Sequence, residues 1–201
     1  MNNKTRTFSQ NQQDLHVIEH YKNMWGGYFL DIGGCFARYD NNTYLLEKDY
    51  GWRGVIVEPQ TRYHREIEQE RKSSLEKRAI WKEECEVEFC YNDETPGLGG
   101  ILETNRVKTL NIIKVQTITF PKLLRKYNCP HFIHYVSLDV EGAEYEVLKE
   151  FPFDEYKVGF WTIEHGNEKD KDRKITELLM SKGYELDRYN AQDFYWRYKQ
   201  D

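Results

Sequence analysis

The chain has 201 residues, of which 31% are charged and 39% hydrophobic, and its formal net charge at pH 7 is -5. This length is enough for a single domain over residues 1–201 with its own hydrophobic core, and the acidic, interspersed charge disfavours a nucleic-acid partner bound through its phosphates. No apolar run is long enough to span a membrane and the first residues lack the apolar core of a signal peptide, so we expect a soluble, cytoplasmic protein with no membrane partner.

The first 25 residues predict a polar segment followed by a helix. Residues 1–8 are polar, whereas residues 12–25 place Leu15, Ile18 and Tyr21 at the spacing of one helical face. We expect this helix to pack near the first strand.

The next stretch predicts a strand, a glycine turn, a helix and a second strand. Residues 28–32 are a short apolar run before Gly33 and Gly34, which indicates a buried strand that stops at a tight turn. The helix that follows ends at Gly51, and residues 55–57 predict the second buried strand. Three residues can cap the start of this helix: Asn41, Asn42 and Thr43.

This order of elements is the half of a doubly wound sheet that binds nucleosides. In such a unit Asp31 and the backbone of Gly33 and Gly34 lie under the ligand, while Glu58, directly after the second strand, accepts hydrogen bonds from both ribose hydroxyls. A dinucleotide fingerprint needs three glycines, but only the first of positions 33, 35 and 37 is glycine. The turn therefore favours S-adenosylmethionine (SAM), which carries no phosphate; the alternative is an ordinary turn that binds no ligand.

After the second strand, residues 62–77 are highly charged and predict a solvated helix. Residues 79–81 predict a short third strand. The end of that strand commonly supplies an adenine contact in this architecture, which makes Ala79 a candidate.

An inserted excursion is predicted over residues 87–120. Residues 87–91 and 115–120 alternate as strands do, and residues 92–100 between them form a loop rich in glycine. The insertion is either an acceptor lid or a plain surface hairpin.

Two further buried strands end in acids. Residues 133–138 are an apolar run followed by Asp139, and residues 158–163 are followed by Glu164. Ligands of open parallel sheets bind beyond the carboxyl ends of the strands, where the strand order reverses. We therefore expect Asp139 and Glu164 to face the same crevice as the acids of the first two strands.

The C-terminal part predicts a helix over residues 170–182 and two alternating strands, at residues 184–189 and 194–198. A closing antiparallel hairpin of this kind belongs to the methyltransferase version of the sheet and is absent from the dehydrogenase version. It favours SAM over a nicotinamide cofactor.

Several segments together resemble the FkbM-type SAM-dependent methyltransferases. They occur in the family's order from about residue 9 onward: Ser9-Gln10 with Gln13-Asp14, then DIGG, NNTYLLEKDYGWRG, IVEP, SLDVEGAEYEVLKEF and TIEHG. The resemblance implies a class I methyltransferase, with an α/β, Rossmann-like fold, a mostly parallel seven-stranded sheet, a C-terminal antiparallel hairpin and helices on both faces. It also implies that the segment with Gln13 lies close to the cofactor.

The resemblance implies an acceptor as well. Family members mostly O-methylate hydroxyls of sugars or of glycosylated and polyketide metabolites, so we expect a sugar or glycan acceptor, for example the deoxyhexose rhamnose, and association or fusion with glycosyltransferases. The chain departs from the family at Cys35, Phe36 and Ala37, so the cofactor loop is either reshaped or binds more weakly. The alternatives are a nucleic-acid or small-metabolite methyltransferase and a non-catalytic methyltransferase-like module.

These patterns predict ten cofactor-binding residues: Gln13, Asp31, Gly33, Gly34, Asn42, Thr43, Glu58, Pro59, Ala79 and Asp139.

A divalent-metal site is predicted at Asp139, Glu164 and His165, because carboxylate oxygens with one imidazole suit Mg²⁺ or Mn²⁺. The layout is similar to that of the catechol-type O-methyltransferases, although Gly142 stands where that group has a lysine base. In the alternative interpretation, Asp139 caps its helix and Glu164 accepts hydrogen bonds from backbone amides.

Methyl transfer to a hydroxyl needs a base or a metal, because a sugar hydroxyl is a very weak acid. His165 is the first candidate for the base if it binds no metal, since the histidine pKa lies near working pH. Glu141 and His134 follow, and Asp139 is a further catalytic candidate.

Overall fold

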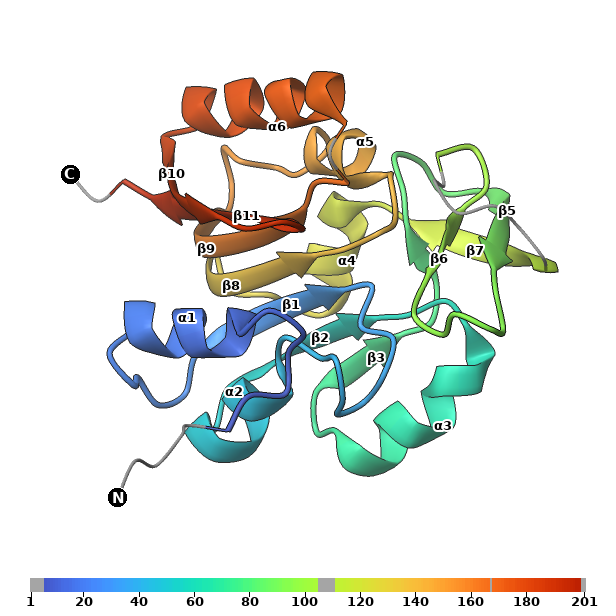
Figure 1. Ribbon diagram of the computed structural model, residues 1–201, viewed down its shortest axis with the longest axis horizontal. Helices are drawn as coiled ribbons and strands as arrows, with labels where there is room; N and C mark the ends of the chain where they lie inside the picture. The colour runs from blue at the N-terminus through green and yellow to red at the C-terminus, as the bar shows by residue number, and fades with distance from the viewer. Residues whose placement is uncertain (1–5, 105–110, 167, 200–201) are drawn as a thin grey trace.

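The computed structural model describes residues 6–104, 111–166 and 168–199, so residues 1–5 of the predicted N-terminal segment and residues 105–110 of the predicted insertion lie outside the described parts. A seven-stranded sheet runs through the centre of the molecule in the order β10-β11-β9-β8-β1-β2-β3 (Figure 1). Its strands are β1 (Tyr28–Ile32), β2 (Arg53–Val57), β3 (Ser74–Glu76), β8 (Phe132–Leu138), β9 (Lys157–Glu164), β10 (Tyr184–Tyr189) and β11 (Asp193–Tyr198).

The sheet is mixed. Strands β1, β2, β3, β8 and β9 run parallel, whereas β11 lies between β9 and β10 and is antiparallel to both. The α/β class and the seven strands are as predicted, but the description of the sheet as mostly parallel with an appended hairpin needs correction. The hairpin turn brings β11 back into the sheet beside β9 and leaves β10 at the edge.

Helices cover both faces of the sheet (Figure 1). One face carries α1 (Gln13–His20), α2 (Tyr44–Tyr50) and α3 (Thr61–Glu70), and the other carries α4 (Phe120–Lys126), α5 (Glu144–Leu148) and α6 (Lys169–Ser181). None of the helices in the described parts of the chain has the length and hydrophobicity that a membrane crossing requires.

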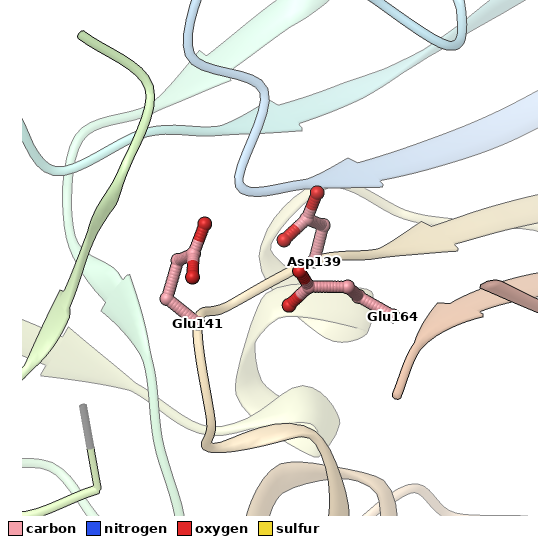
Figure 2. A group of neighbouring side chains, drawn as sticks. All are labelled: Asp139, Glu141 and Glu164. Carbon is pink, nitrogen blue, oxygen red and sulfur yellow. The ribbon is translucent and has the colours of Figure 1, made fainter. Parts of the chain in front are cut away.

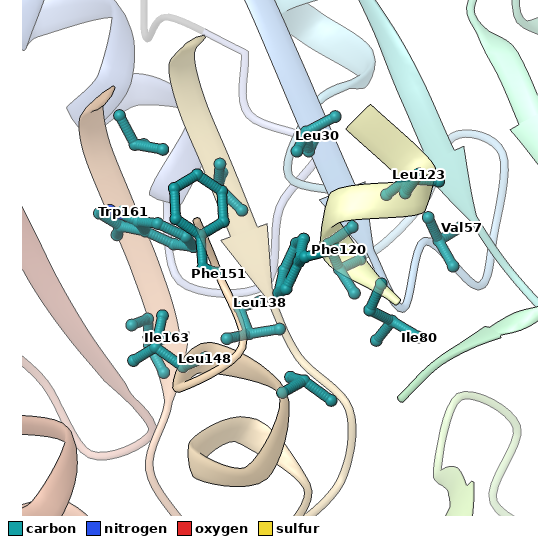
Figure 3. Close-up of a cluster of buried hydrophobic side chains, with 14 of the residues drawn as sticks. Leu30, Val57, Ile80, Phe120, Leu123, Leu138, Leu148, Phe151, Trp161 and Ile163 are labelled. Atoms are coloured by element: carbon teal, nitrogen blue, oxygen red, sulfur yellow. The ribbon is translucent and has the colours of Figure 1, made fainter. Parts of the chain in front are cut away.

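Apolar side chains leave the sheet on both faces and form two clusters. Along β1, Leu30 and Ile32 belong to the cluster under α4, α5 and α6, while Phe29 belongs to the cluster under the other three helices. Figure 3 shows the first cluster, where side chains from α4 and α5 gather over the central strands. Because both faces are buried, these strands are nearly unbroken apolar runs, which is why short apolar runs predicted them.

A second, smaller sheet lies beyond the carboxyl ends of the main sheet (Figure 1). Its order is β4-β7-β5-β6, with β4 (Ala79–Ile80), β5 (Glu86–Tyr91), β6 (Gly99–Ile101) and β7 (Asn111–Ile118). The predicted antiparallel insertion is present in β5, β6 and β7, but β4 joins β7 in parallel, and α4 begins at Phe120, where a strand was predicted.

The third strand of the main sheet is β3, so the prediction of this strand at residues 79–81 was wrong. The predicted helix over residues 62–77 ends at Glu70, because Arg71 is extended (φ -108°, ψ 146°) and its side chain is buried. The short edge strand β3 that follows has Leu75 as its single apolar residue, which left no apolar run to predict it. The first helix also ends early, at His20, because Lys22 and Asn23 adopt positive φ.

The register of the parallel strands sets which residues leave the sheet together. Ile32 pairs with Val57 and with Leu138, and Leu138 pairs with Ile163. The four residues that follow these positions therefore leave the sheet at one edge: Gly33, Glu58, Asp139 and Glu164.

A buried polar network holds the turn between β1 and α2. The Asp31 carboxylate accepts hydrogen bonds from Asn41 Nδ2 at 3.0 Å and Thr43 Oγ1 at 2.6 Å. Arg71, whose side chain is fully buried, donates to Asn41 Oδ1, Thr43 Oγ1 and the carbonyl of Ala37. Burial raises the pKa of Asp31, and among the interactions that lower this pKa the charge of the Arg71 guanidinium is the strongest. The network ties the turn to the end of α3.

Arg71→Leu should destabilise the protein because Arg71 Nε lies 3.4 Å from Glu47 Oε1, and the substitution leaves the Glu47 and Asp31 carboxylates without this buried positive charge. Breaking a buried charge pair from one side costs about 3–5 kcal/mol, and we expect a loss of this size in the free energy of unfolding, measured by urea denaturation. Arg65→Leu, at an exposed position on α3, is the control and should leave the urea midpoint unchanged. An Arg71→Leu protein as stable as the control would contradict a stabilising role for the network.

Candidate active site

A pocket lies beyond the carboxyl ends of β1, β2, β8 and β9. It encloses about 1130 Å³, part of which is open solvent. Its walls are the sheet edge, the turn after β1, the segment before α1, the small sheet and the loop at residues 96–98 that leads into β6. Among the lining residues that the structure describes there is no Lys or Arg, but there are six acids: Asp40, Glu58, Asp139, Glu141, Glu164 and Asp193.

Glu58 lines this pocket and is 2% exposed. Its Oε2 accepts the Cys35 N–H at 3.0 Å and its Oε1 accepts the Gln60 N–H at 2.7 Å. Burial raises the pKa of Glu58 to about 7, although both N–H groups stabilise the carboxylate. Each carboxylate oxygen has two lone pairs, so the pair of oxygens can still accept two vicinal hydroxyls.

The turn after β1 requires glycine. Gly33 has a φ of 89°, and a Cβ at this position would lie 1.8 Å from the carbonyl oxygen of Asp139. The N–H groups of Gly33 and Gly34 both donate to the Val57 carbonyl, at 3.0 and 3.1 Å. The turn therefore packs against the ends of both neighbouring strands, and Gly33 is exposed to the pocket.

Residues 35–37, where the sequence departs from the resembled family, form a loop against Glu58 and α3. Cys35 adopts a φ of 41°, an uncommon conformation for a residue other than glycine or asparagine. Phe36 packs edge-on against Tyr63 at 5.2 Å between ring centroids, and Ala37 is fully buried. The loop directs a backbone N–H, that of Cys35, at the Glu58 carboxylate.

Three carboxylates converge at the other side of the pocket. Figure 2 shows Asp139 and Glu141, from the loop after β8, and Glu164, from the end of β9, facing a common space. One carboxylate oxygen of each lies within 4.8 Å of the others. Burial and the neighbouring charges of Glu164 and Glu141 raise the pKa of Asp139 well above its usual range. The group therefore favours an added proton or a cation.

The loop that carries two of these acids is fixed by a buried ion pair. Glu144, which is fully buried, accepts the N–H groups of Val140 and Gly142 at 3.2 and 3.0 Å, and Lys171 of α6 donates to its other oxygen at 2.6 Å. Within this loop Glu141 has a φ of 55°. The fixed backbone directs Asp139 and Glu141 into the pocket.

Seven of the ten predicted cofactor residues line the pocket: Gln13, Gly33, Asn42, Glu58, Pro59, Ala79 and Asp139. The other three, Asp31, Gly34 and Thr43, lie behind its wall. Asp31 is the residue before the last one of β1, and it pairs with Ile56 and Ser137 within the sheet. Its carboxylate therefore joins the Arg71 network and does not face the pocket. Thr43 belongs to the same network, and a Cβ on Gly34 would meet the Ile56 side chain at 2.3 Å.

His165 does not join the metal candidates that were predicted with it. It is 5% exposed, its Nε2 donates to the Asn190 carbonyl at 3.1 Å, and its ring lies 4.5 Å from that of Phe194. Successive residues of an extended chain point to opposite sides, so Glu164 faces the pocket and His165 faces away. Glu141 takes the place in the acid group that was predicted for His165.

His134 also lies away from the pocket. It is near the start of β8, about 16 Å along the strand from Asp139. Its Nδ1 accepts the Tyr28 N–H at 3.1 Å, and its ring contacts those of Tyr21 and Trp52. The prediction of His134 as a base is therefore corrected, because this residue is at the amino end of the strand.

Sequence reasoning identified Gln13, but not the polar cluster that it forms with Asn11, Gln192 and Asp193 at one side of the pocket. Asn11 Nδ2 donates to Gln192 Oε1, and Gln13 Nε2 donates to Asp193 Oδ2 at 2.9 Å. All four residues line the pocket. They join segments about 180 residues apart, so no local pattern could have predicted the group.

Comparison with known proteins gives a family and a fold. The family model described as "Methyltransferase FkbM domain" matches residues 31–186. No curated protein matches this chain. Precorrin-6y C5,15-methyltransferase from Geobacter metallireducens GS-15 is similar in structure, with a TM-score of 0.53 and 12% identity over 98% of this chain and 92% of that chain. A methyltransferase from Pyrococcus furiosus, with 13% identity over 90% and 80% of the two chains, has a TM-score of 0.42, too low to carry an argument.

The precorrin methyltransferase supports the class I methyltransferase fold, and at 12% identity it supports the fold alone. The family match covers most of the chain and includes the turn after β1, Glu58 and the three converging carboxylates. Membership of this family implies SAM as the methyl donor. The chain belongs to the FkbM methyltransferase domain family.

Proposed function

We propose that this protein transfers the methyl group of SAM to a hydroxyl oxygen of a sugar or glycan, for example of a deoxyhexose such as rhamnose. One observation carries the proposal: a single pocket has Glu58 at one side and three converging carboxylates at the other. The first side suits a ribose, and the second suits the removal of a proton from a hydroxyl. The sugar class of the acceptor rests on the family resemblance.

The cofactor is proposed to lie between the turn after β1 and the end of β2. Glu58 would accept hydrogen bonds from the ribose hydroxyls, and Pro59 and Ala79 would flank the adenine. Gly33 brings bare backbone to the pocket, and Asn42, which donates to Ser137 Oγ at 2.9 Å, is positioned beside it. The negative pocket also suits the positive sulfonium of SAM.

The acceptor is proposed to lie against the amides Gln10, Asn11 and Gln192. A side-chain amide can both donate to and accept from hydroxyls, and the carboxylates beside these amides accept from hydroxyls, as a polyhydroxylated ring requires. The described lining has acids and no cation, which disfavours a phosphorylated acceptor and a nucleic acid.

The reaction needs alignment and a proton acceptor. The hydroxyl oxygen attacks the sulfonium methyl carbon, the carbon–sulfur bond breaks, and the proton passes to a carboxylate as the new bond forms. Asp139 is proposed as this base because its raised pKa makes it a better proton acceptor than an ordinary carboxylate. Glu141, whose carboxylate faces the same space, is the second candidate.

A divalent cation at the same carboxylates is the alternative to Asp139 as the base, because a bound cation would oppose the rise in the Asp139 pKa. Asp139, Glu141 and Glu164 offer the hard oxygen ligands that Mg²⁺ or Mn²⁺ takes, with water at the remaining positions. Such an ion would supply Lewis acidity that lowers the pKa of the acceptor hydroxyl.

Glu58→Gln should weaken the binding of S-adenosylhomocysteine, the demethylated cofactor, by about 100-fold at pH 8, because it removes charge-assisted hydrogen bonds to the ribose. Isothermal titration calorimetry measures the dissociation constant. Glu66→Gln, on the exposed side of α3, is the matched control and should bind as the unmodified protein does. An unmodified protein that binds neither SAM nor its product would refute the proposed function and favour a non-catalytic module.

Cofactor affinity should depend on pH through Glu58. The pKa of this group is raised to about 7, so its ionised, ribose-binding form decreases as the pH falls from 8 to 6. We expect the affinity for 5′-methylthioadenosine, which has the ribose but no ammonium or carboxylate, to fall by about tenfold over this range. In Glu58→Gln the affinity should be independent of pH. An unmodified protein with the same affinity at both pH values would show that Glu58 does not titrate there.

Methyl transfer should be detected by mass spectrometry when the protein is incubated with SAM and a panel of rhamnose-containing and other glycans. If a cation is essential, a chelator should lower turnover by about tenfold or more and added Mg²⁺ should restore it. Full activity in the chelator would exclude an essential ion and leave the carboxylates as the base.

Asp139→Asn and Glu164→Gln should each lower kcat while S-adenosylhomocysteine affinity changes little; the opposite pattern would assign them to cofactor binding.

A further inference from the structure

The side chain of Gln60 is an unexplained polar group at the pocket. Gln60 follows Glu58 and Pro59 at the end of β2, lines the pocket and is 4% exposed. Its Oε1 is buried and has no hydrogen-bond partner within the described residues. Burying an amide carbonyl without a partner costs free energy, so such an atom indicates a donor that a ligand supplies.

The surroundings of this carboxamide suit a flat aromatic ring. Val57, Ile80, Phe89 and Ile101 line the same pocket, and none of them is more than 5% exposed. Apolar walls bind the faces of a purine, while its edge needs hydrogen-bond partners. Gln60 lies between β2 and α3 and brings a side-chain amide to these apolar walls.

The insertion is shaped to approach this carboxamide. A Cβ on Gly99 would lie 3.1 Å from Gln60 Nε2 and 3.0 Å from the Phe89 ring. Glycine at this position therefore lets β6 lie directly against Gln60, so that the small sheet closes this side of the pocket.

The backbone of Gln60 links it to the ribose side. Its N–H donates to Glu58 Oε1 at 2.7 Å, so the carboxamide extends from a residue that is itself bonded to the proposed ribose acceptor. A base attached to a ribose held by Glu58 is within reach of the next side chains along the chain, which are Pro59 and Gln60.

We infer that Gln60 recognises the 6-amino group of adenine, with Oε1 accepting from that amino group and Nε2 donating to the adjacent ring nitrogen. A glutamine amide makes this pair of hydrogen bonds with adenine when it recognises that base in DNA. The inference rests on the proposed function, since it requires the pocket to hold SAM, and it adds a residue that selects the adenine base.

The test compares S-adenosylhomocysteine with its 6-deamino analogue, in which purine replaces adenine, by isothermal titration calorimetry. The unmodified protein should bind the adenine compound about tenfold more tightly, the effect of one hydrogen bond that leaves a buried acceptor unpaired when it is lost. In Gln60→Leu the two compounds should bind equally. Gln60→Glu keeps the acceptor oxygen and should keep the preference, and Gln116→Leu, at an exposed position on β7 outside the pocket, is the matched control.

The outcomes separate this inference from the proposed function. Equal binding of both compounds to the unmodified protein, or a full preference retained in Gln60→Leu, would overturn the role of Gln60 while leaving SAM binding intact. No binding of either compound would overturn both. Because the first comparison uses the unmodified protein, it stands even if a variant does not fold.

Discussion

The parallel register between β1 and its neighbours β2 and β8 is the constraint on which the site depends. Because Ile32 is level with both Val57 and Leu138, three strands end at the same height. Gly33 can then pack against the Asp139 backbone, where any side chain would collide, and the acids that follow the strands enter one pocket. A slip of one residue would turn each of these side chains to the opposite face.

Charge is the second constraint. Acids gathered in a partly buried pocket repel one another, and each must be stabilised or must bind a proton or cation. Glu58 is stabilised by two backbone N–H groups, and Glu144 by two N–H groups and Lys171. Burial raises the pKa of both Glu58 and Asp139, and for Asp139 the neighbouring carboxylates Glu164 and Glu141 raise it further. The two stabilised acids, Glu58 and Glu144, thus hold the backbone in place, and Asp139 is the acid that we propose as the base.

Much of the fold followed from local patterns. Apolar runs predicted the central strands because these are buried on both faces, and Gly51 ends α2 in the left-handed conformation that glycine adopts most easily. The prediction failed where a strand carried no such run. The edge strand β3 has one apolar residue. Ala79 and Ile80 form a strand that pairs with β7 in the small sheet, and local sequence does not determine which strand is the partner.

By itself, the sequence determined that the strands end in acids and that a glycine turn follows β1, because strand ends and turns depend on neighbouring residues. Only the tertiary structure decided which of these side chains share the pocket. Asp31 lies one residue before the end of β1, so its side chain stays outside the pocket. The side chain of His165 points away from that of Glu164 and contacts the Asn190 carbonyl. The tertiary structure also decided the contact of Gln13 with Asp193, because packing and not spacing along the chain brings these distant segments together. The same holds for Gln60, whose Oε1 is buried without a partner among the described residues.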